Sequence, residues 1–195
     1  MKTRQTISAT AAAIHLLLAA CSLAAERDGA LKRDYNVKPV PFSKVHAADK
    51  FWSSRLETSR NVTVPYCFQK CEETDRISNF EKAAGRKQGE FKGIYFNDSD
   101  VFKVIEGAAY ALAIKREAKL EGYVDDVIGK IAAAQEPDGY LYTARTLCGA
   151  DYMPPGGKER WSDIAAGHEL YNVGHLYEAA VAYYQATGKR SLMEV

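Results

Sequence analysis

Residues 161–188 limit most strongly what this chain can fold into, because they predict one long helix. Ser162 and Asp163 can cap its start, since a short side-chain oxygen accepts hydrogen bonds from the free backbone N–H groups of a first turn. Gly188 can adopt the left-handed conformation that ends many helices, and two basic residues follow it, where positive charge suits the helix dipole. A helical fold is therefore expected.

The predicted helix has two different faces. Residues spaced by three and four form an apolar stripe that we expect to face the core: Leu170, Val173, Tyr177, Val181 and Tyr184. A second line combines imidazole, phenol, carboxylate and small side chains: His168, Tyr171, His175, Glu178 and Ala182. Such a line suits the wall of a polar cavity. An exposed surface that happens to hold two histidines is the open alternative.

His168 and Glu169 begin like the HExxH motif of zinc proteases, but the spacing excludes that site. The motif needs a second histidine four residues after the first, and position 172 is Asn. His175 follows seven residues after His168, roughly 10.5 Å along a helix that rises about 1.5 Å per residue. Two imidazoles that far apart cannot bind one ion through metal–nitrogen bonds of about 2 Å.

Residues 1–25 have the pattern of an export signal and are set aside from the fold. Two basic residues precede an apolar run, residues 7–20, that is too short for a permanent membrane span. The run ends at Cys21 in a sequence typical of bacterial lipoproteins, which predicts acylation of Cys21 and an anchor in the outer membrane or a periplasmic location. Ordinary cleavage after residues 22–24, giving a secreted protein, is the alternative.

The cysteines do not predict a disulfide framework or a metal site. If Cys21 is lipidated, an odd number remains: Cys67, Cys71 and Cys148. Cys67 and Cys71 are four residues apart and could form half of a soft-metal site, but no second pair follows at zinc-like spacing. Buried thiols are the preferred interpretation, and no metal ligand is assigned.

Charge and composition exclude two other classes of protein. The chain has 26 basic and 25 acidic residues, a net charge of +1, whereas nucleic-acid binders usually have a basic excess. Hydrophobic residues make up 47% of the sequence, enough for a folded core. We therefore expect a globular protein without a nucleic-acid partner.

The rest of the chain predicts more helices joined by loops. Residues 26–41 are expected to be a linker, and residues 42–45 a short strand. The expected helices are residues 51–66 up to Pro65, with Trp52 and Leu56 packing inward, residues 100–119 and residues 121–134.

Local signals accompany these helices. Asp98 or Ser99 is expected to cap the helix over residues 100–119, whose buried stripe is Val101, Ile105, Ala108 and Leu112. The third helix is expected to bury Val124, Ile128 and Ile131 and to stop at a turn formed by residues 137–139. Residues 81–93 and 144–160 are expected to be loops. Residues 42–195 then form part of a helical toroid with about two hairpins, too few to close a ring, and the sequence is expected to be truncated.

Several segments together resemble the N-terminal part of glycoside hydrolase family 127, the β-L-arabinofuranosidase family. The opening segment contributes Phe51, Trp52 and Arg55. The resemblance covers roughly residues 40–195, and its motifs occur in the right order: residues 96–103 (FNDSDVFK), 135–141 (QEPDGYL), 168–171 (HELY), 174–180 (GHLYEAA) and 186–188 (ATG).

The resemblance implies a mainly α chain forming part of an (α/α)6 barrel, the N-terminal portion of a longer catalytic domain. Family members remove terminal β-L-arabinofuranose with retention, through a Glu acid/base and a Cys nucleophile held by zinc. Those residues are expected beyond Val195, and none of the three remaining cysteines matches their context, so no catalytic residue or metal ligand is assigned here. The implied partner is an arabinose-containing oligosaccharide or polysaccharide of plants. A non-catalytic carbohydrate-binding or scaffold protein, or an inactive truncated product, is the alternative.

The resemblance also implies a set of sugar-binding residues. His168 is expected to contact a furanose hydroxyl, because imidazole both donates and accepts hydrogen bonds. Residues 98–100 and 138–140 are expected to line or brace the same rim, although Asp98 also suits a helix cap. His175 and Glu178 either orient the pocket or simply pack. The candidate substrate-binding residues are His168, Asp98, Asp138, Tyr140 and His175.

Overall fold

The structure is a computed structural model that describes residues 37–149 and 159–195. The predicted signal segment with Cys21, most of the linker over residues 26–41, and the Pro-Gly part of the predicted loop over residues 144–160 lie outside the described residues. Residues 37–40 belong to a separate unit from residues 41–195. The description below concerns residues 41–195.

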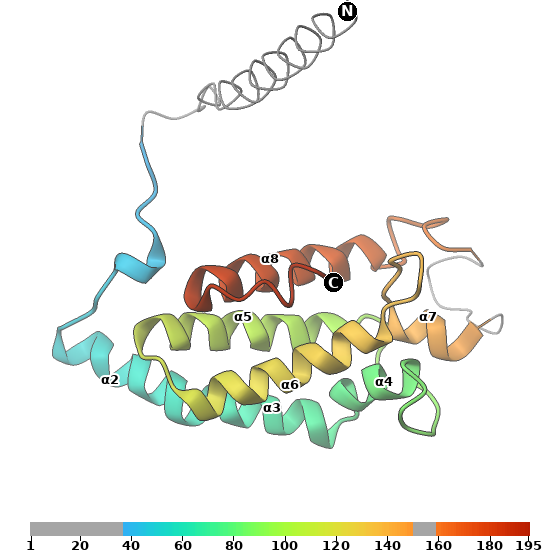
Figure 1. Ribbon diagram of the computed structural model, residues 1–195, viewed down its shortest axis with the longest axis horizontal. Helices are drawn as coiled ribbons and strands as arrows, with labels where there is room; N and C mark the ends of the chain where they lie inside the picture. The colour runs from blue at the N-terminus through green and yellow to red at the C-terminus, as the bar shows by residue number, and fades with distance from the viewer. Residues whose placement is uncertain (1–36, 150–158) are drawn as a thin grey trace, which may run out of the picture. The chain divides into compact units, whose positions relative to one another are not determined.

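The described part of the chain is built from helices and contains no strand. Figure 1 shows the arrangement. No described helix is both long and apolar enough to cross a membrane. In chain order the elements are η1 Phe42–Lys44, α2 Lys50–Thr58, η2 Ser59–Thr63, α3 Val64–Glu73, α4 Arg76–Ala83, α5 Asp98–Ile114, α6 Ala118–Ala134, α7 Thr143–Cys148 and α8 Glu169–Thr187.

Helices α5 and α8 lie side by side and run in the same direction (Figure 1). At their first turns the Ser99 N–H donates to Asn172 Oδ1 at 2.8 Å. At the other end Lys189, just after α8, contacts Glu121 near the start of α6, the helix that follows α5. Helix α6 returns antiparallel and packs with α3 and α4 as a second layer against α5 (Figure 1).

The core lies between these two layers and confirms two predicted stripes. Val101, Ile105, Ala108 and Leu112 of α5 are buried, as are Val124, Ile128 and Ile131 of α6. These residues recur at helical spacing on one face of each helix, so the spacing of apolar residues alone was enough to predict the buried face. The predicted turn after α6 is also present, with Gly139 at φ 88°.

Pro65 does not end the first long helix, contrary to the prediction. Helix α2 continues through the π-helical turn η2 into α3, which carries Pro65 in its first turn. Proline has no N–H and its ring crowds the carbonyl four residues earlier. In the wider turn the Val64 N–H instead donates to the Ser59 carbonyl, five residues back, which accommodates the proline. Trp52 was expected inside but is 57% exposed.

Four further local predictions were wrong. Residues 42–44 form a 3-10 turn, not a strand. The expected loop over residues 81–93 begins only after α4, whose apolar face buries Ile77 and Phe80 in the core. Asp98 is the first residue of α5 and makes no capping bond, because its carboxylate is used elsewhere. The expected loop over residues 144–160 begins with helix α7.

The last helix begins later than predicted, at Glu169. Asp163 caps a separate turn before it, where its carboxylate accepts from the Ala166 N–H at 3.0 Å. His168 then adopts a left-handed conformation, φ 56°, which interrupts the helical path and makes His168 the N-cap. Gly188 ends the helix in the left-handed conformation, φ 78°, as predicted.

The buried face of α8 also differs from the prediction. Most of the expected apolar stripe is exposed: Leu170 at 52%, Tyr177 at 65%, Val181 at 47% and Tyr184 at 40%. The face against α5 instead carries Asn172, Leu176, Ala179, Ala180 and Tyr183, opposite a helix that is itself rich in alanine. Small residues let two helix backbones approach closely, so the buried face of α8 is the one that carries alanines. The prediction instead selected the face with the largest apolar side chains, which is the exposed one.

Candidate functional site

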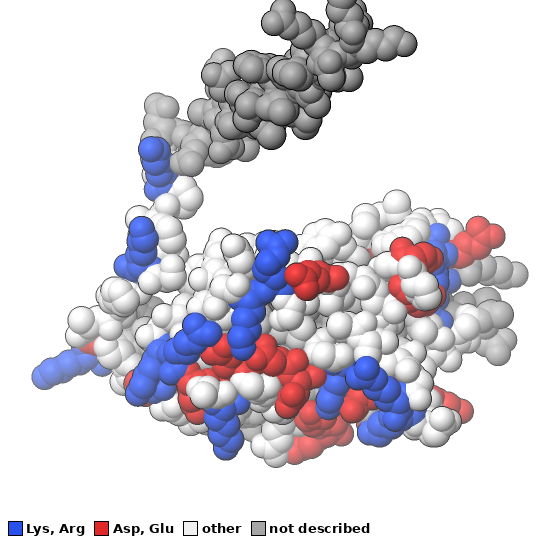
Figure 2. All heavy atoms as spheres, viewed as in Figure 1, with Lys and Arg blue, Asp and Glu red and all other residues white. Residues whose placement is uncertain are grey.

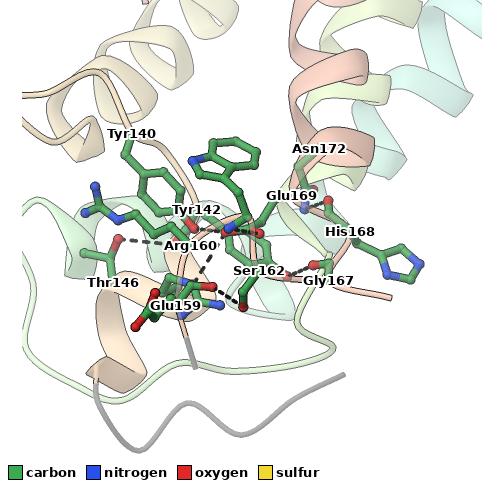
Figure 3. A network of polar contacts seen from close by, with 12 residues as sticks. Tyr140, Tyr142, Thr146, Glu159, Arg160, Ser162, Gly167, His168, Glu169 and Asn172 are labelled. Carbon is green, nitrogen blue, oxygen red and sulfur yellow. Dashed lines mark hydrogen bonds and ion pairs between the residues drawn. The ribbon is translucent and has the colours of Figure 1, made fainter. Parts of the chain in front are cut away.

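The candidate residues gather where α5 and α8 begin and α6 ends. His168 precedes α8, His175 lies two turns into it, Asp98 opens α5, and Asp138 and Tyr140 follow α6. Contacts between these segments join them into one region, part of which is shown in Figure 3. Residues that are distant in sequence are therefore neighbours at one end of the helical layers.

Glu169 is the centre of this region and was not among the predicted site residues. Its carboxylate is 2% exposed and accepts from the Tyr140 hydroxyl at 2.5 Å and from the Trp161 backbone N–H at 2.8 Å. The Arg145 guanidinium lies 3.5 Å away and is also buried. Because a buried charge must be paired and hydrogen-bonded, these contacts hold the start of α8 firmly against the loop after α6. Its sequence signals were an acidic residue near the start of a predicted helix and its place in the HELY motif of residues 168–171.

Asp138 and Arg160 hold the loop around Tyr140. Asp138 accepts from the Tyr140 N–H at 3.2 Å and from Arg160 at 2.6 Å, and Arg160 also pairs with Glu136. The Tyr140 N–H and the Arg160 guanidinium hold the pKa of Asp138 below its usual range. Arg160 also lies over the Tyr140 ring, 3.9 Å from its centroid. Asp138 remains largely exposed and accessible to a ligand, whereas Tyr140 is buried.

Asp98 joins α5 to α7. Its carboxylate is 1% exposed and accepts from the Thr143 N–H at 2.8 Å and from the Thr143 hydroxyl at 2.5 Å. Burial raises the pKa of Asp98 to about 6, although the two hydrogen bonds from Thr143 oppose the shift. With both oxygens occupied and no exposure, Asp98 can brace the region, but it has no surface with which to contact a sugar.

His168 is only partly buried, and its ring lies outside the buried polar network. Its Nδ1 lies 2.7 Å from the Ala166 carbonyl oxygen, and its ring stacks on Phe96 with centroids 4.6 Å apart. Figure 3 shows the imidazole pointing away from the Tyr140–Glu169 network. Nδ1 has two neighbours, the Ala166 carbonyl at 2.7 Å and the Tyr95 hydroxyl at 3.4 Å. Because the nearer group can only accept, we assign the proton to Nδ1, which leaves Nε2 of the neutral ring as an acceptor.

Two further rings, those of Tyr171 and His175, continue from His168 along α8. Tyr171 lies edge-to-face with His168 at 5.6 Å and with His175 at 4.7 Å. The Lys103 ammonium of α5 donates to the Tyr171 hydroxyl at 2.5 Å, and His175 Nδ1 lies 3.1 Å from the Glu178 carboxylate. The polar and aromatic members of the line expected on this helix thus lie together and offer donors, acceptors and ring edges, whereas its last member, Ala182, is buried in the core.

The described residues do not fit a zinc site. They contain no group of three His, Cys, Asp or Glu side chains arranged to hold a metal. Zinc binds thiolates, yet burial raises the pKa of Cys71 to about 11 and also raises the pKa of Cys148. We therefore derive no chemical step through a metal from these side chains.

Comparison with known proteins identifies relatives that share this architecture. A curated non-reducing end β-L-arabinofuranosidase of Bifidobacterium longum subsp. longum is 42% identical over 119 residues, covering 61% of this chain and 18% of that protein. A solved GH127 β-arabinofuranosidase matches with a TM-score of 0.77 and 50% identity, covering 82% of this chain and 26% of its own. A GH127 β-L-arabinofuranosidase of Geobacillus stearothermophilus T6 matches with a TM-score of 0.68 and 42% identity, covering 75% and 23%.

This chain thus spans about a quarter or less of the length of these relatives. The mainly α fold predicted as part of an (α/α)6 barrel is confirmed, because the described helices match part of solved GH127 structures. Residues 44–195 match the family model described as β-L-arabinofuranosidase, GH127 catalytic domain. The match covers well over half of the sequence, and the chain therefore belongs to the GH127 β-L-arabinofuranosidase family.

Proposed function

We propose that this chain supplies one wall of the sugar site of a β-L-arabinofuranosidase that releases terminal L-arabinofuranose, or a related sugar, from plant glycans. The observation that carries the proposal is the partly buried imidazole of His168, fixed by Ala166 and Phe96, in a chain of this family. A furanose presents several hydroxyl groups, and a fixed neutral imidazole is a good partner for one of them.

The other candidate residues divide into contacting and supporting roles. Asp138, His175 and Tyr171 have exposed atoms near His168 or on the rim and contact the sugar or the next unit of the glycan. Asp98 and Tyr140 are buried and support the rim through Thr143 and Glu169. A site with one wall held by buried polar contacts keeps its geometry when the ligand binds, which lowers the entropic cost of binding.

Bond cleavage is assigned to residues outside this sequence. The family resemblance implies a retaining double displacement by a Glu acid/base and a zinc-bound Cys, expected beyond Val195. We expect the purified 195-residue chain to release no nitrophenol from 4-nitrophenyl β-L-arabinofuranoside. Zinc-dependent turnover by this chain would show that its own residues perform the chemistry and would overturn this assignment.

Sugar binding is tested by calorimetric or NMR titration of the 195-residue chain with methyl β-L-arabinofuranoside. For a single wall we expect a dissociation constant on the order of 1 mM, equivalent to roughly 4 kcal/mol. His168→Ala should weaken binding about tenfold or more without unfolding the chain. His46→Ala is the matched control, because His46 is exposed and remote from the site in sequence. Equal affinities of both variants would remove His168 from the site.

We further propose that the protein is exported and lipidated at Cys21, as an outer-membrane-anchored or periplasmic lipoprotein. The support is the sequence of residues 1–25 alone. Metabolic labelling with a fatty-acid analogue in a bacterial host should label the chain, and Cys21→Ser should abolish the label. Export of an unlabelled wild-type chain cleaved after residues 22–24 would favour the secreted alternative.

A further inference from the structure

The backbone at His168 needs a specific support. His168 has φ 56°, a left-handed conformation that is unfavourable for a residue with a side chain. Non-glycine residues keep such a conformation only where surrounding contacts determine it. The side chain that makes these contacts therefore also decides where the imidazole points.

Asn172 makes the contacts that hold this backbone. Its side-chain Nδ2 donates to the His168 carbonyl oxygen at 3.0 Å, and its Oδ1 accepts from the Ser99 N–H at 2.8 Å. A carbonyl can only accept and a backbone N–H can only donate, so the orientation of this amide is fixed by its partners. Asn172 is 1% exposed, which keeps both bonds out of competition with water.

The same amide links His168 to its stacking partner. The Ser99 hydroxyl donates to the Phe96 carbonyl at 2.9 Å. The backbone segment that is hydrogen-bonded to Asn172 at Ser99 therefore also carries the Phe96 ring. Phe96 and His168 are nearly parallel, with an interplanar angle of 17°. One buried side chain thus connects the backbone of His168 to the segment that carries the ring stacked on its imidazole.

We propose that Asn172 is a positioning residue that holds His168 left-handed, with Nδ1 donating to Ala166 and Nε2 presented as a hydrogen-bond acceptor to a ligand hydroxyl. The identity of that ligand, a terminal arabinofuranoside, rests on the proposed function. The position of the imidazole does not. Because Nε2 is an acceptor, it needs a hydrogen-bond donor on the ligand. We therefore expect a sugar with a free hydroxyl at this position to bind, and the same sugar with that hydroxyl methylated not to bind.

The experiment compares Asn172→Asp with Asn79→Asp. Both asparagines are buried, and each accepts from a backbone N–H and donates to a backbone carbonyl; for Asn79 both groups belong to Lys92. Each substitution replaces the donating NH2 by an oxygen that faces a carbonyl, so the local loss of hydrogen bonding is alike. Of these two asparagines, Asn172 is the one that is hydrogen-bonded to His168.

The readout is the ¹⁵N spectrum of the imidazoles in the full 195-residue chain above the pKa of histidine, with His168 assigned by His168→Gln. In the wild type and in Asn79→Asp we expect His168 to be protonated at Nδ1 and unprotonated at Nε2. In Asn172→Asp the signals should move toward the mixture of tautomers of a free imidazole, and affinity for methyl β-L-arabinofuranoside should fall about tenfold.

Two results would overturn the proposal. One is a folded Asn172→Asp variant whose His168 nitrogens are unchanged. The other is a wild-type His168 protonated at Nε2, a result that stands even if the variant does not fold. If the tautomer changes as expected but no variant, nor the wild type, binds the arabinoside, the positioning role is upheld and the proposed function fails instead.

Discussion

The two ends of the α5–α8 pair contain similar polar groups in opposite surroundings. At the site end, Tyr140 donates to Glu169 at 2.5 Å with Arg145 beside it. At the far end, Tyr183 donates to Asp125 at 2.7 Å, and Lys189 binds the same carboxylate. Glu169 is 2% exposed, whereas the Asp125 side chain is 36% exposed. Figure 2 shows basic and acidic side chains interleaved on the surface around α6.

This difference in burial decides what each network can do. Water competes for an exposed ion pair and dissolved salt screens it, so the pair contributes little and can rearrange. A buried carboxylate has no alternative partner, so its tyrosine and arginine must stay in place. The ion pair at the far end therefore stays open to water and salt, while the buried network at the site end fixes atomic positions next to His168.

The largest expected effect comes from removing the central charge of each network. Glu169→Gln removes a buried charge and turns an NH2 group toward either the Tyr140 hydroxyl or the Trp161 N–H, which are both donors, and should cost about 3 kcal/mol or more of unfolding free energy. Asp125→Asn removes the corresponding charge from the partly exposed network at the far end, and it should cost less than about 1 kcal/mol of unfolding free energy. Equilibrium unfolding in urea measures both. Losses of equal size would show that burial does not distinguish the two ends.

The next effect is a pH dependence of opposite sign at two carboxylates. Burial raises the pKa of Asp98 to about 6, above its value in the unfolded chain, so folding favours the protonated form and this group's contribution is lost as pH rises from about 4 through 6. Hydrogen bonds from Arg116 and then Lys189 lower the pKa of Glu121 to about 2, so its contribution is lost as pH falls from about 4.5 toward 2.

Unfolding free energies between pH 2 and 7 separate these two contributions. Relative to the wild type, Asp98→Asn should flatten the decline between pH 4 and 6, and Glu121→Gln should flatten the loss on the acid side. We expect the Glu121 contribution to be the smaller, because Arg116 is more than half exposed. The assignment fails if Asp98→Asn leaves the curve between pH 4 and 6 parallel to that of the wild type.

The smallest expected effect is that of salt. At 1 M ionic strength the screening length is about 3 Å, which weakens exposed pairs and hardly reaches buried ones. The stability difference between wild type and Asp125→Asn should therefore shrink toward zero in 1 M NaCl, while the difference caused by Glu169→Gln should persist. A salt-sensitive Glu169 difference would mean that solvent reaches the site end.

The parts of the fold predictable from sequence were those with short-range causes. The buried stripes of α5 and α6 follow from apolar spacing, Gly139 and Gly188 from the need for positive φ, and the polar line of α8 from the positions of His168 and His175. The motifs chosen from the family resemblance lie near one another at the ends of α5, α6 and α8, and their role in sugar binding stays a prediction. Each of these signals is contained within a few turns of helix.

The features that sequence reasoning missed depend on partners far along the chain. Glu169 becomes a central residue only because Tyr140 and Arg145 fold onto it. Asn172 is an ordinary polar helix residue until Ser99 lies opposite. The buried face of α8 was misassigned for the same reason, since alanines are favoured there only because another alanine-rich helix packs against them.

The most direct test of the account is the ¹⁵N signal of His168 Nε2 while methyl β-L-arabinofuranoside is added to the 195-residue chain. We predict that Nε2 shifts with saturation as it accepts a sugar hydroxyl, while Nδ1, bound to Ala166, stays in place. Binding of the sugar with no change at Nε2 would contradict a site built around this imidazole.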